Sequence, residues 1–105
     1  MSDEHDDSLL EVKLTAETAK IRWSELQRFF AQGRAVQVRE GTDLIQVAVA
    51  MSRDQAERIE ALMRDGRVRR VSDAQAREWI TGDALVWALV LRPWVLVQGI
   101  IDPGD

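Results

Sequence analysis

Cysteine is absent from this chain of 105 residues, and histidine occurs only once, as His5. Without cysteine the chain has no disulfide, no thiolate metal ligand and no cysteine nucleophile. His5 stands among acidic residues in a segment that we expect to be mobile, so it lacks the preorganisation that a catalytic histidine needs. One imidazole also cannot supply a metal site built from several histidines. We therefore expect a protein that is not an enzyme and that has no metal or cofactor.

Glycine-rich loops and an excess of basic residues are missing as well. The six glycines are scattered singly, so no loop can cradle a phosphate, and a net charge of −4 at pH 7 opposes nucleic acid as a default partner. The N-terminus, MSDEHDDS, has neither the basic nor the apolar region of a signal peptide, which indicates a cytoplasmic protein. Carboxylates are the remaining enzyme candidates, for instance Glu57 with Glu60, or Asp83 near Trp87. Glu57 and Glu60 fall on the polar face of an expected helix, where charges ordinarily serve solubility, and Asp83 follows Gly82 as a turn residue.

The longest apolar run covers residues 84–101, ALVWALVLRPWVLVQGII, and is interrupted near its centre by Arg92 and Pro93. An arginine at the centre of a spanning helix costs about 2.5–3.5 kcal/mol, and a proline breaks the helix, so we expect no membrane helix here. The many β-branched and aromatic residues favour two strands instead, at about 84–91 and 94–100. Arg92-Pro93 is then either a kink within one long strand or a tight corner between two.

Helix boundaries carry a repeated local signal, the sequence S-x-x-Q, which begins at Ser24, Ser52 and Ser72. In this arrangement the serine oxygen accepts from a backbone N–H of the first turn, and the glutamine reaches back to the serine N–H. A glycine, the residue type that most easily takes the left-handed conformation after a helix, follows each start, at Gly33, Gly66 and Gly82. The pattern predicts helices at about 25–32, 53–65 and 73–81, and apolar spacing indicates a further helix within 9–21.

The remaining segments predict a sheet and two short tails. Residues 36–39 and 44–51 are read as a hairpin, and 67–71 as one more short strand. Residues 1–8 are too acidic to repay the entropy of ordering, so we expect a disordered tail there and a second one at 102–105. The fold class expected for residues 9–101 is a single α+β domain with a mixed or mainly antiparallel sheet of four to five strands and three to four short helices.

Two surfaces are candidate binding sites. One is an arginine cluster that could hold an anion, made of Arg64, Arg67, Arg69 and Arg70. The other is the apolar run, whose alternating residues leave both faces of a strand in need of cover. If helices cover one face alone, a second copy would bury the other, and we expect a homodimer through an interface that includes Leu85, Trp87, Leu89 and Trp94.

Three segments, ETAKIRWSELQRFFAQG, DLIQVAVAM and LVWALVLRPWVLVQ, carry a resemblance to a known family. Across residues 14–98 the chain resembles a family of small uncharacterised bacterial proteins that is catalogued only as a domain of unknown function. The resemblance implies a bacterial single-domain protein and brings no activity or ligand with it. The sequence as a whole favours a self-associating protein-binding or regulatory module. The alternatives are a weak nucleic-acid or phosphate binder that uses the arginine cluster, and a carboxylate-based enzyme.

Overall fold

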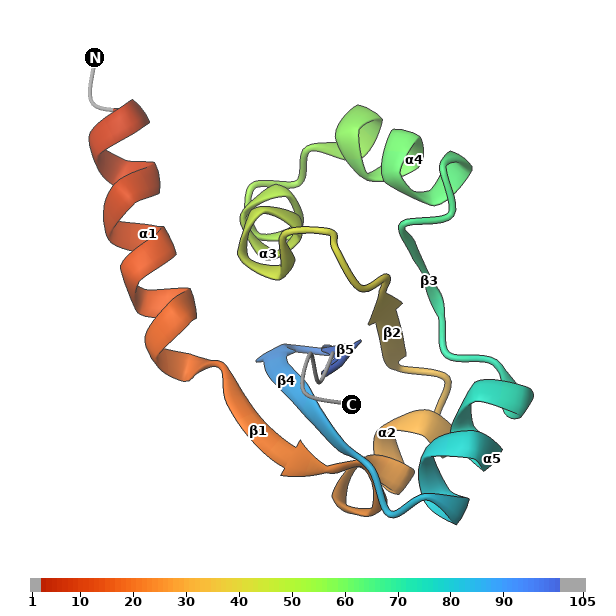
Figure 1. Cartoon of the computed structure of the whole chain (residues 1–105). Coiled ribbons are helices and arrows are strands. Elements are labelled where there is room, and N and C mark those ends of the chain that lie inside the picture. Colours follow the sequence, from red (N-terminus) through yellow and green to blue (C-terminus); the bar gives the residue numbers. More distant parts are fainter. Residues whose placement is uncertain (1–2, 101–105) are drawn as a thin grey trace.

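The computed structural model describes residues 3–100, which form one α+β domain (Figure 1). Its helices are α1 (Asp3–Glu17), α2 (Gln27–Ala31), α3 (Leu44–Ser52), α4 (Ala56–Arg64) and α5 (Asp73–Thr81), with a short 3-10 helix, η1 (Trp23–Leu26), before α2. Its strands are β1 (Ala19–Arg22), β2 (Ala35–Val38), β3 (Val68–Arg70), β4 (Leu85–Leu91) and β5 (Trp94–Gly99). The predicted fold class is confirmed, with more helices than expected.

The five strands form a single sheet in the order β1-β4-β5-β2-β3. β2 and β5 are parallel, and every other neighbouring pair is antiparallel. The predicted strands in the apolar run form the central hairpin, in which Leu91 pairs with Trp94. Arg92-Pro93 is therefore a tight corner between two strands, and its peptide bond is cis.

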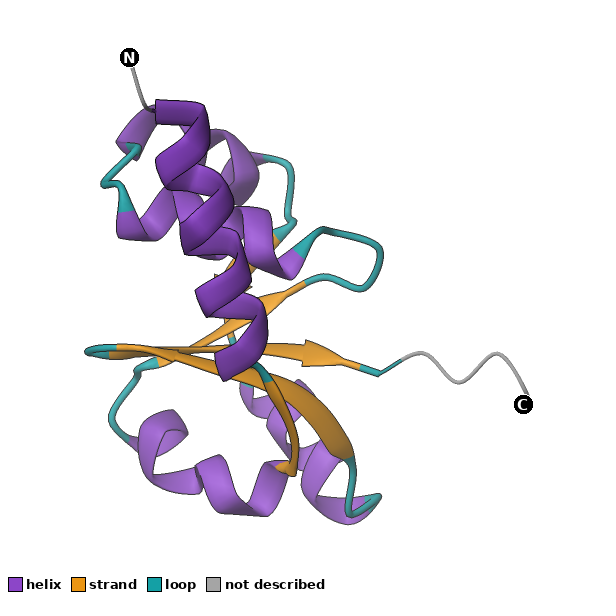
Figure 2. Cartoon of the chain, turned by 90° about the vertical axis from the view of Figure 1, so that its left-hand side faces the viewer, coloured by secondary structure: helices purple, strands orange, loops and turns teal. Residues whose placement is uncertain are grey.

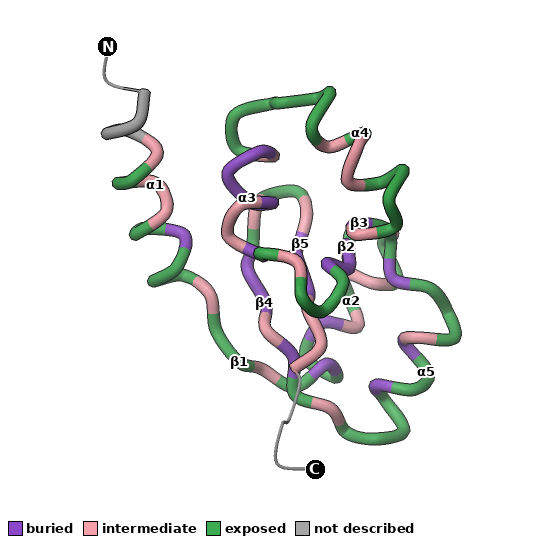
Figure 3. The backbone as a smooth tube through the Cα atoms, turned by 45° about the horizontal axis from the view of Figure 1, so that its top comes forward, coloured by how far each residue is buried: buried purple, intermediate pink, exposed green. Residues whose placement is uncertain are grey.

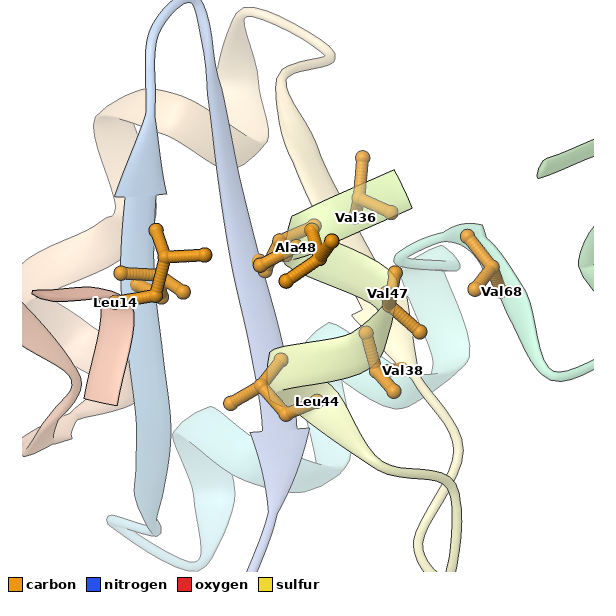
Figure 4. Packing of buried hydrophobic residues seen from close by; sticks show 10 residues of the cluster. Leu14, Val36, Val38, Leu44, Val47, Ala48 and Val68 are labelled. Atoms are coloured by element: carbon orange, nitrogen blue, oxygen red, sulfur yellow. The ribbon is translucent and has the colours of Figure 1, made fainter. Parts of the chain in front are cut away.

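Helices cover both faces of this sheet (Figure 2), with α1, α3 and α4 on one side and η1, α2 and α5 on the other. The first core lies under α3 and consists of Leu14, Val36, Val38, Leu44, Val47, Ala48, Val49, Val68, Leu89 and Leu96 (Figure 4). The second core consists of Trp23, Leu26, Ala35, Val71, Ala76, Trp79, Val86, Ala88, Val95 and Val97. The two cores divide the central strands by alternation, since successive residues of a strand point to opposite faces.

Residues 44–51 are a helix, so the predicted hairpin with 36–39 is wrong. Asp43 caps α3, because its side chain accepts from the backbone N–H groups of Ile45 (3.0 Å) and Gln46 (3.1 Å). The alternation of Val47 and Val49 suggested a strand facing solvent on one side. Both are buried, as are Ala48 and Ala50 between them, and a helix enclosed on most sides has no clear polar face to reveal its period.

One of the three predicted caps is correct. Ser72 accepts from the N–H of Gln75 at 3.1 Å, and α5 spans 73–81 as predicted. Ser24 lies inside η1, and Ser52 is the last residue of α3, so neither caps a helix. Of the three glycines, Gly33 and Gly66 have positive φ angles, whereas Gly82 does not, and Asp83 after it takes that conformation.

The N-terminal region also differs from the prediction. Helix α1 begins at Asp3, so residues 3–8 are helical, although they were expected to be disordered. Acidic residues stabilise the N-terminal turn of a helix, and Asp7 forms an ion pair of 2.8 Å with Arg53 at the end of α3. Residues 19–21, expected to end this helix, belong instead to β1, which pairs with β4. Residues 1–2 and the predicted tail at 102–105 lie outside the described part of the chain.

Candidate functional site

A cleft of about 650 Å³ lies between the sheet and α4. Such a volume is typical of ligand pockets. Its apolar walls are formed by Met51, Ile59, Met63, Leu91, Pro93 and Trp94, and its floor by Val36 and Val68. Its polar residues are Ser52, Asp54, Arg69, Arg70 and Arg92. The cleft therefore joins an apolar interior to a mouth that carries three arginines and one carboxylate.

Helix α4 forms the roof of the cleft and is only partly buried. None of its nine residues is buried, and Figure 3 draws it as exposed and intermediate throughout. Its apolar residues Ile59 and Met63 are one turn apart and so share a face, yet Met63 is 56% exposed. Asp54, with a φ of 54°, turns the chain between α3 and α4. The roof thus presents an apolar face that the chain itself covers only in part.

The opposite wall of the cleft comes from the corner of the central hairpin. Leu91 and Trp94 are cross-strand partners, so they lie on the same face of the sheet as the first core. The guanidinium of Arg70 lies over the ring of Trp94, 5.9 Å from its centroid, in cation–π geometry. This contact holds a positive charge at the apolar wall while leaving N–H donors of the guanidinium free for a ligand.

The cleft is electropositive in a protein whose net charge is −4. Among the described side chains, no carboxylate forms an ion pair with Arg69, Arg70 or Arg92. Asp54 is the one acidic residue in the lining. An unpaired arginine offers a planar fork of donors that fits a carboxylate or phosphate, so the mouth of the cleft is suited to an anionic group.

The predicted arginine cluster does not act as one surface. Arg64 ends α4, and Arg67 donates from Nη1 to the Oγ1 of Thr42 at 3.3 Å. Arg69 and Arg70 are successive residues of β3, so their side chains point to opposite faces of the sheet. Arg70 lies on the cleft face, because it pairs with Val36 of the first core. The cluster therefore supplies the cleft with part of its charge.

Sequence reasoning missed Arg92 and Met51 as members of a site. Arg92 appeared only as an interruption of the apolar run, and its separation of more than 20 residues from Arg70 conceals that both line one cleft. Met51 was assigned to a strand that does not exist. The available signal was the spacing of Ile59 and Met63, which predicted an apolar helix face but not that this face would remain partly open.

The predicted interface residues lie on one face of the sheet but differ in how far they are exposed. Leu89 is 1% exposed and belongs to the first core, so it is not available to a partner. Trp87 is half-buried against the same core, with the Nζ of Lys20 5.2 Å from its ring centroid. Leu85 is 50% exposed, and Trp94 lines the cleft. Because helices cover both faces of the sheet, an uncovered face no longer argues for the expected homodimer.

A smaller cavity of about 290 Å³ lies on the other side of β3 and is lined by Gln37, Arg39, Gly66 and Arg69. Gln37 is 6% exposed, and its Nε2 donates to the Oε1 of Gln75 at 3.2 Å. The Oε1 of Gln37 has no hydrogen-bond partner among the described residues. This oxygen is itself buried, so the groups that the cavity offers to a ligand are mainly those of its two arginines, Arg39 and Arg69.

The described part of the chain contains neither a candidate metal site nor a candidate membrane-spanning helix. No group of three or more His, Asp or Glu side chains within it could hold a metal ion. No helix within it combines the length and apolarity that crossing a bilayer requires. Glu57 and Glu60 are exposed residues of α4, as expected for its polar face.

Comparisons with known proteins agree with the resemblance seen in the sequence. The solution structure of PA1075 from Pseudomonas aeruginosa matches with a TM-score of 0.78 and 39% sequence identity, covering 90% of this chain and 88% of that chain. No curated protein matches the sequence. The model of a family described as "Protein of unknown function (DUF2288)" matches residues 9–99. These residues include the three segments quoted above, β1, the central hairpin and all the walls of the cleft, and the chain belongs to this family of unknown function.

Proposed function

We propose that this protein is a binding module, and that its cleft holds a segment of a partner protein that is apolar and negatively charged. The observation that carries the proposal is the pairing of an apolar cleft of about 650 Å³ with Arg70 and Arg92, which line it and have no carboxylate partner among the described side chains. Apolar side chains of the partner would enter between α4 and the hairpin corner. A carboxylate beside them would pair with Arg70 or Arg92.

The nature of the walls supports a protein segment as the occupant. Met51 and Met63 line the cleft, and methionine is common on surfaces that adapt to peptide side chains because it is flexible and polarizable. Helix α4 has no fully buried residue and packs on the first core through the partly buried Leu62, so a shift of this helix to fit an occupant disturbs few buried contacts. Nucleic acid is a weaker candidate, because the arginines are divided between two faces of β3 and form no continuous basic stripe.

Affinity capture from the native cell with charge-reversed variants tests the proposal. The wild-type protein is compared with Arg70→Glu, which reverses a charge in the cleft, and with Arg77→Glu, which makes the same change on an exposed residue of α5. We expect at least one protein to be retained by the wild type and by Arg77→Glu and to be lost by Arg70→Glu. Equal retention by all three of every captured protein would contradict the proposal.

A further inference from the structure

Strand β3 forms an edge of the sheet, with β2 on one side and no described strand on the other (Figure 1). It pairs with β2 on one side, in antiparallel register, with Val36 opposite Arg70, Gln37 opposite Arg69 and Val38 opposite Val68. No other described strand lies beside it. An edge of this kind presents backbone N–H and C=O groups that a further strand can pair with.

The hydrogen bonds around β2 identify which groups are open. Arg39 donates to the carbonyl of Arg67, and Val71 donates to the carbonyl of Ala35, so the odd-numbered residues of β2 bond toward β3. Bonded and non-bonded pairs alternate in an antiparallel ladder, and Arg69 with Gln37 is therefore a bonded pair. Val68 and Arg70 are the non-bonded positions. Their N–H and C=O groups point away from β2, toward the open edge.

The open edge adjoins the cleft. Val68 and Arg70, whose backbone groups point away from β2, also line the cleft, and of the two Arg70 is exposed whereas Val68 is 5% exposed. Met63 of α4, 56% exposed, lines the same cleft from its roof. A strand added beside β3 would point alternate side chains to the cleft side of the sheet. Residues on that side would lie beside Val68 and Arg70, and those on the other side would lie beside Arg69.

The positive charge of β3 favours an acidic strand over a second copy of this chain at the open edge. Arg69 and Arg70 make up two of the three residues of β3, and neither is ion-paired within the described side chains. A second copy paired edge to edge through β3 would bring arginines against arginines, and like charges across a strand pair are destabilising. A partner strand that carries glutamate or aspartate would instead be attracted to these arginines.

We propose that β3 accepts an extended, acidic segment of a partner protein as a sixth strand, hydrogen-bonded to the backbone of Val68 and Arg70. This inference rests on the proposed function and names the mode of binding at the same site. Backbone pairing supplies affinity, the cleft receives the alternate apolar side chains, and Arg69, on the opposite face of β3, selects the acidic residues between them.

The probe is a short peptide of alternating glutamate and valine, blocked at both ends. It is compared with two N-methylated analogues that are isomers of each other. In one isomer the valine nitrogens are methylated, and in the other the glutamate nitrogens are methylated. Only alternate residues of a strand direct their N–H groups to one neighbour, so strand addition makes the two isomers unequal. We expect one isomer to bind roughly tenfold more weakly than the parent peptide, from the loss of about two hydrogen bonds, and the other to bind like the parent.

Amide hydrogen exchange of the protein gives an independent readout. On saturation with the parent peptide, exchange at Val68 and Arg70 should slow, whereas Arg69 should change little because its N–H is already bonded to β2. A peptide of alternating lysine and valine should not bind, and equal binding by it would overturn the requirement for acid. Failure of the glutamate peptide to bind would overturn strand addition.

The outcomes separate this inference from the proposed function. If both methylated isomers bind like the parent, and exchange slows in α4 but not at Val68 and Arg70, strand addition is wrong and the cleft remains the binding site. If the capture experiment finds no protein that depends on Arg70, the proposed function is wrong whatever the peptides do.

Discussion

Removing the side chain of Asp43 should destabilise the protein, because that side chain is the N-cap of α3. It accepts from the N–H groups of Ile45 at 3.0 Å and Gln46 at 3.1 Å, which have no partner within the helix. Replacing an aspartate N-cap with alanine typically costs about 1 kcal/mol, and at most about 2 kcal/mol. We therefore expect Asp43→Ala to lower the free energy of unfolding by about 1 kcal/mol.

Two serines provide matched controls for this substitution. Ser72→Ala removes the observed cap of α5, in which the Ser72 oxygen accepts from Gln75, and should cost about 1 kcal/mol as well. Ser52→Ala should change stability by less than about 0.5 kcal/mol, because Ser52 is an exposed residue at the end of α3 and caps nothing. The sequence pattern alone predicted the opposite for Ser52.

Urea denaturation followed by tryptophan fluorescence measures all three variants, since Trp23 and Trp79 are buried in the second core and become exposed on unfolding. With a denaturant slope of about 2 kcal/mol per molar urea, a loss of 1 kcal/mol shifts the midpoint by about 0.5 M. The refuting result is a normal midpoint for Asp43→Ala together with a lowered midpoint for Ser52→Ala. That result would restore the strand at 44–51 and the helix start at 53.

Three further predictions concern the sheet. Leu96→Ala should lower the free energy of unfolding by roughly 2–5 kcal/mol, because Leu96 is fully buried in the first core and the sheet cannot collapse into the space left behind; a urea midpoint close to that of the wild type would contradict this packing. Gln37→Met should change the free energy of unfolding by less than about 1 kcal/mol, because removal of a buried oxygen without a partner among the described residues offsets loss of the bond that Nε2 donates to the Oε1 of Gln75; a fall in the midpoint of more than about 0.5 M would indicate that this oxygen is satisfied. Light scattering after size exclusion tests the homodimer expected from the sequence, and we expect the mass of one chain, since the exposed Leu85 and Val90 lie on opposite faces of β4; a doubled mass that Leu85→Lys returns to one chain would contradict this expectation.

Local signals in the sequence were reliable where a few neighbouring residues decide the structure. Pro93 within the apolar run predicted the division into β4 and β5, because proline restricts its own φ and the residue before it. Ser72 predicted the start of α5, and Gly66 the end of α4, because both act through the backbone within one turn. The S-x-x-Q pattern failed at Ser52, where the helix before it, capped by Asp43, extends through the serine.

The apolar segment 44–51 shows where local reasoning ends. Val47, Val49 and Met51 fit a strand period, while Leu44, Val47, Ala48 and Met51 fit a helical one, so the sequence is ambiguous. The tertiary structure decides for the helix, since Leu44, Val47 and Ala48 fill the first core between Leu14 and Val68 (Figure 4). A segment that is surrounded by other elements loses the polar face on which its period could be read.

The sequence by itself determined a small α+β domain, the central hairpin, the helix α5, the absence of cysteine chemistry and membership in the family. Only the tertiary structure decided the strand order, the cover on both faces of the sheet and the cleft. The physical reason is the distance along the chain over which each interaction acts. Caps, proline and apolar period act within a few residues, whereas the cleft requires the end of α3, the face of α4, the edge strand β3 and the corner at Arg92-Pro93 to meet, and no local pattern specifies which distant segments will pack together.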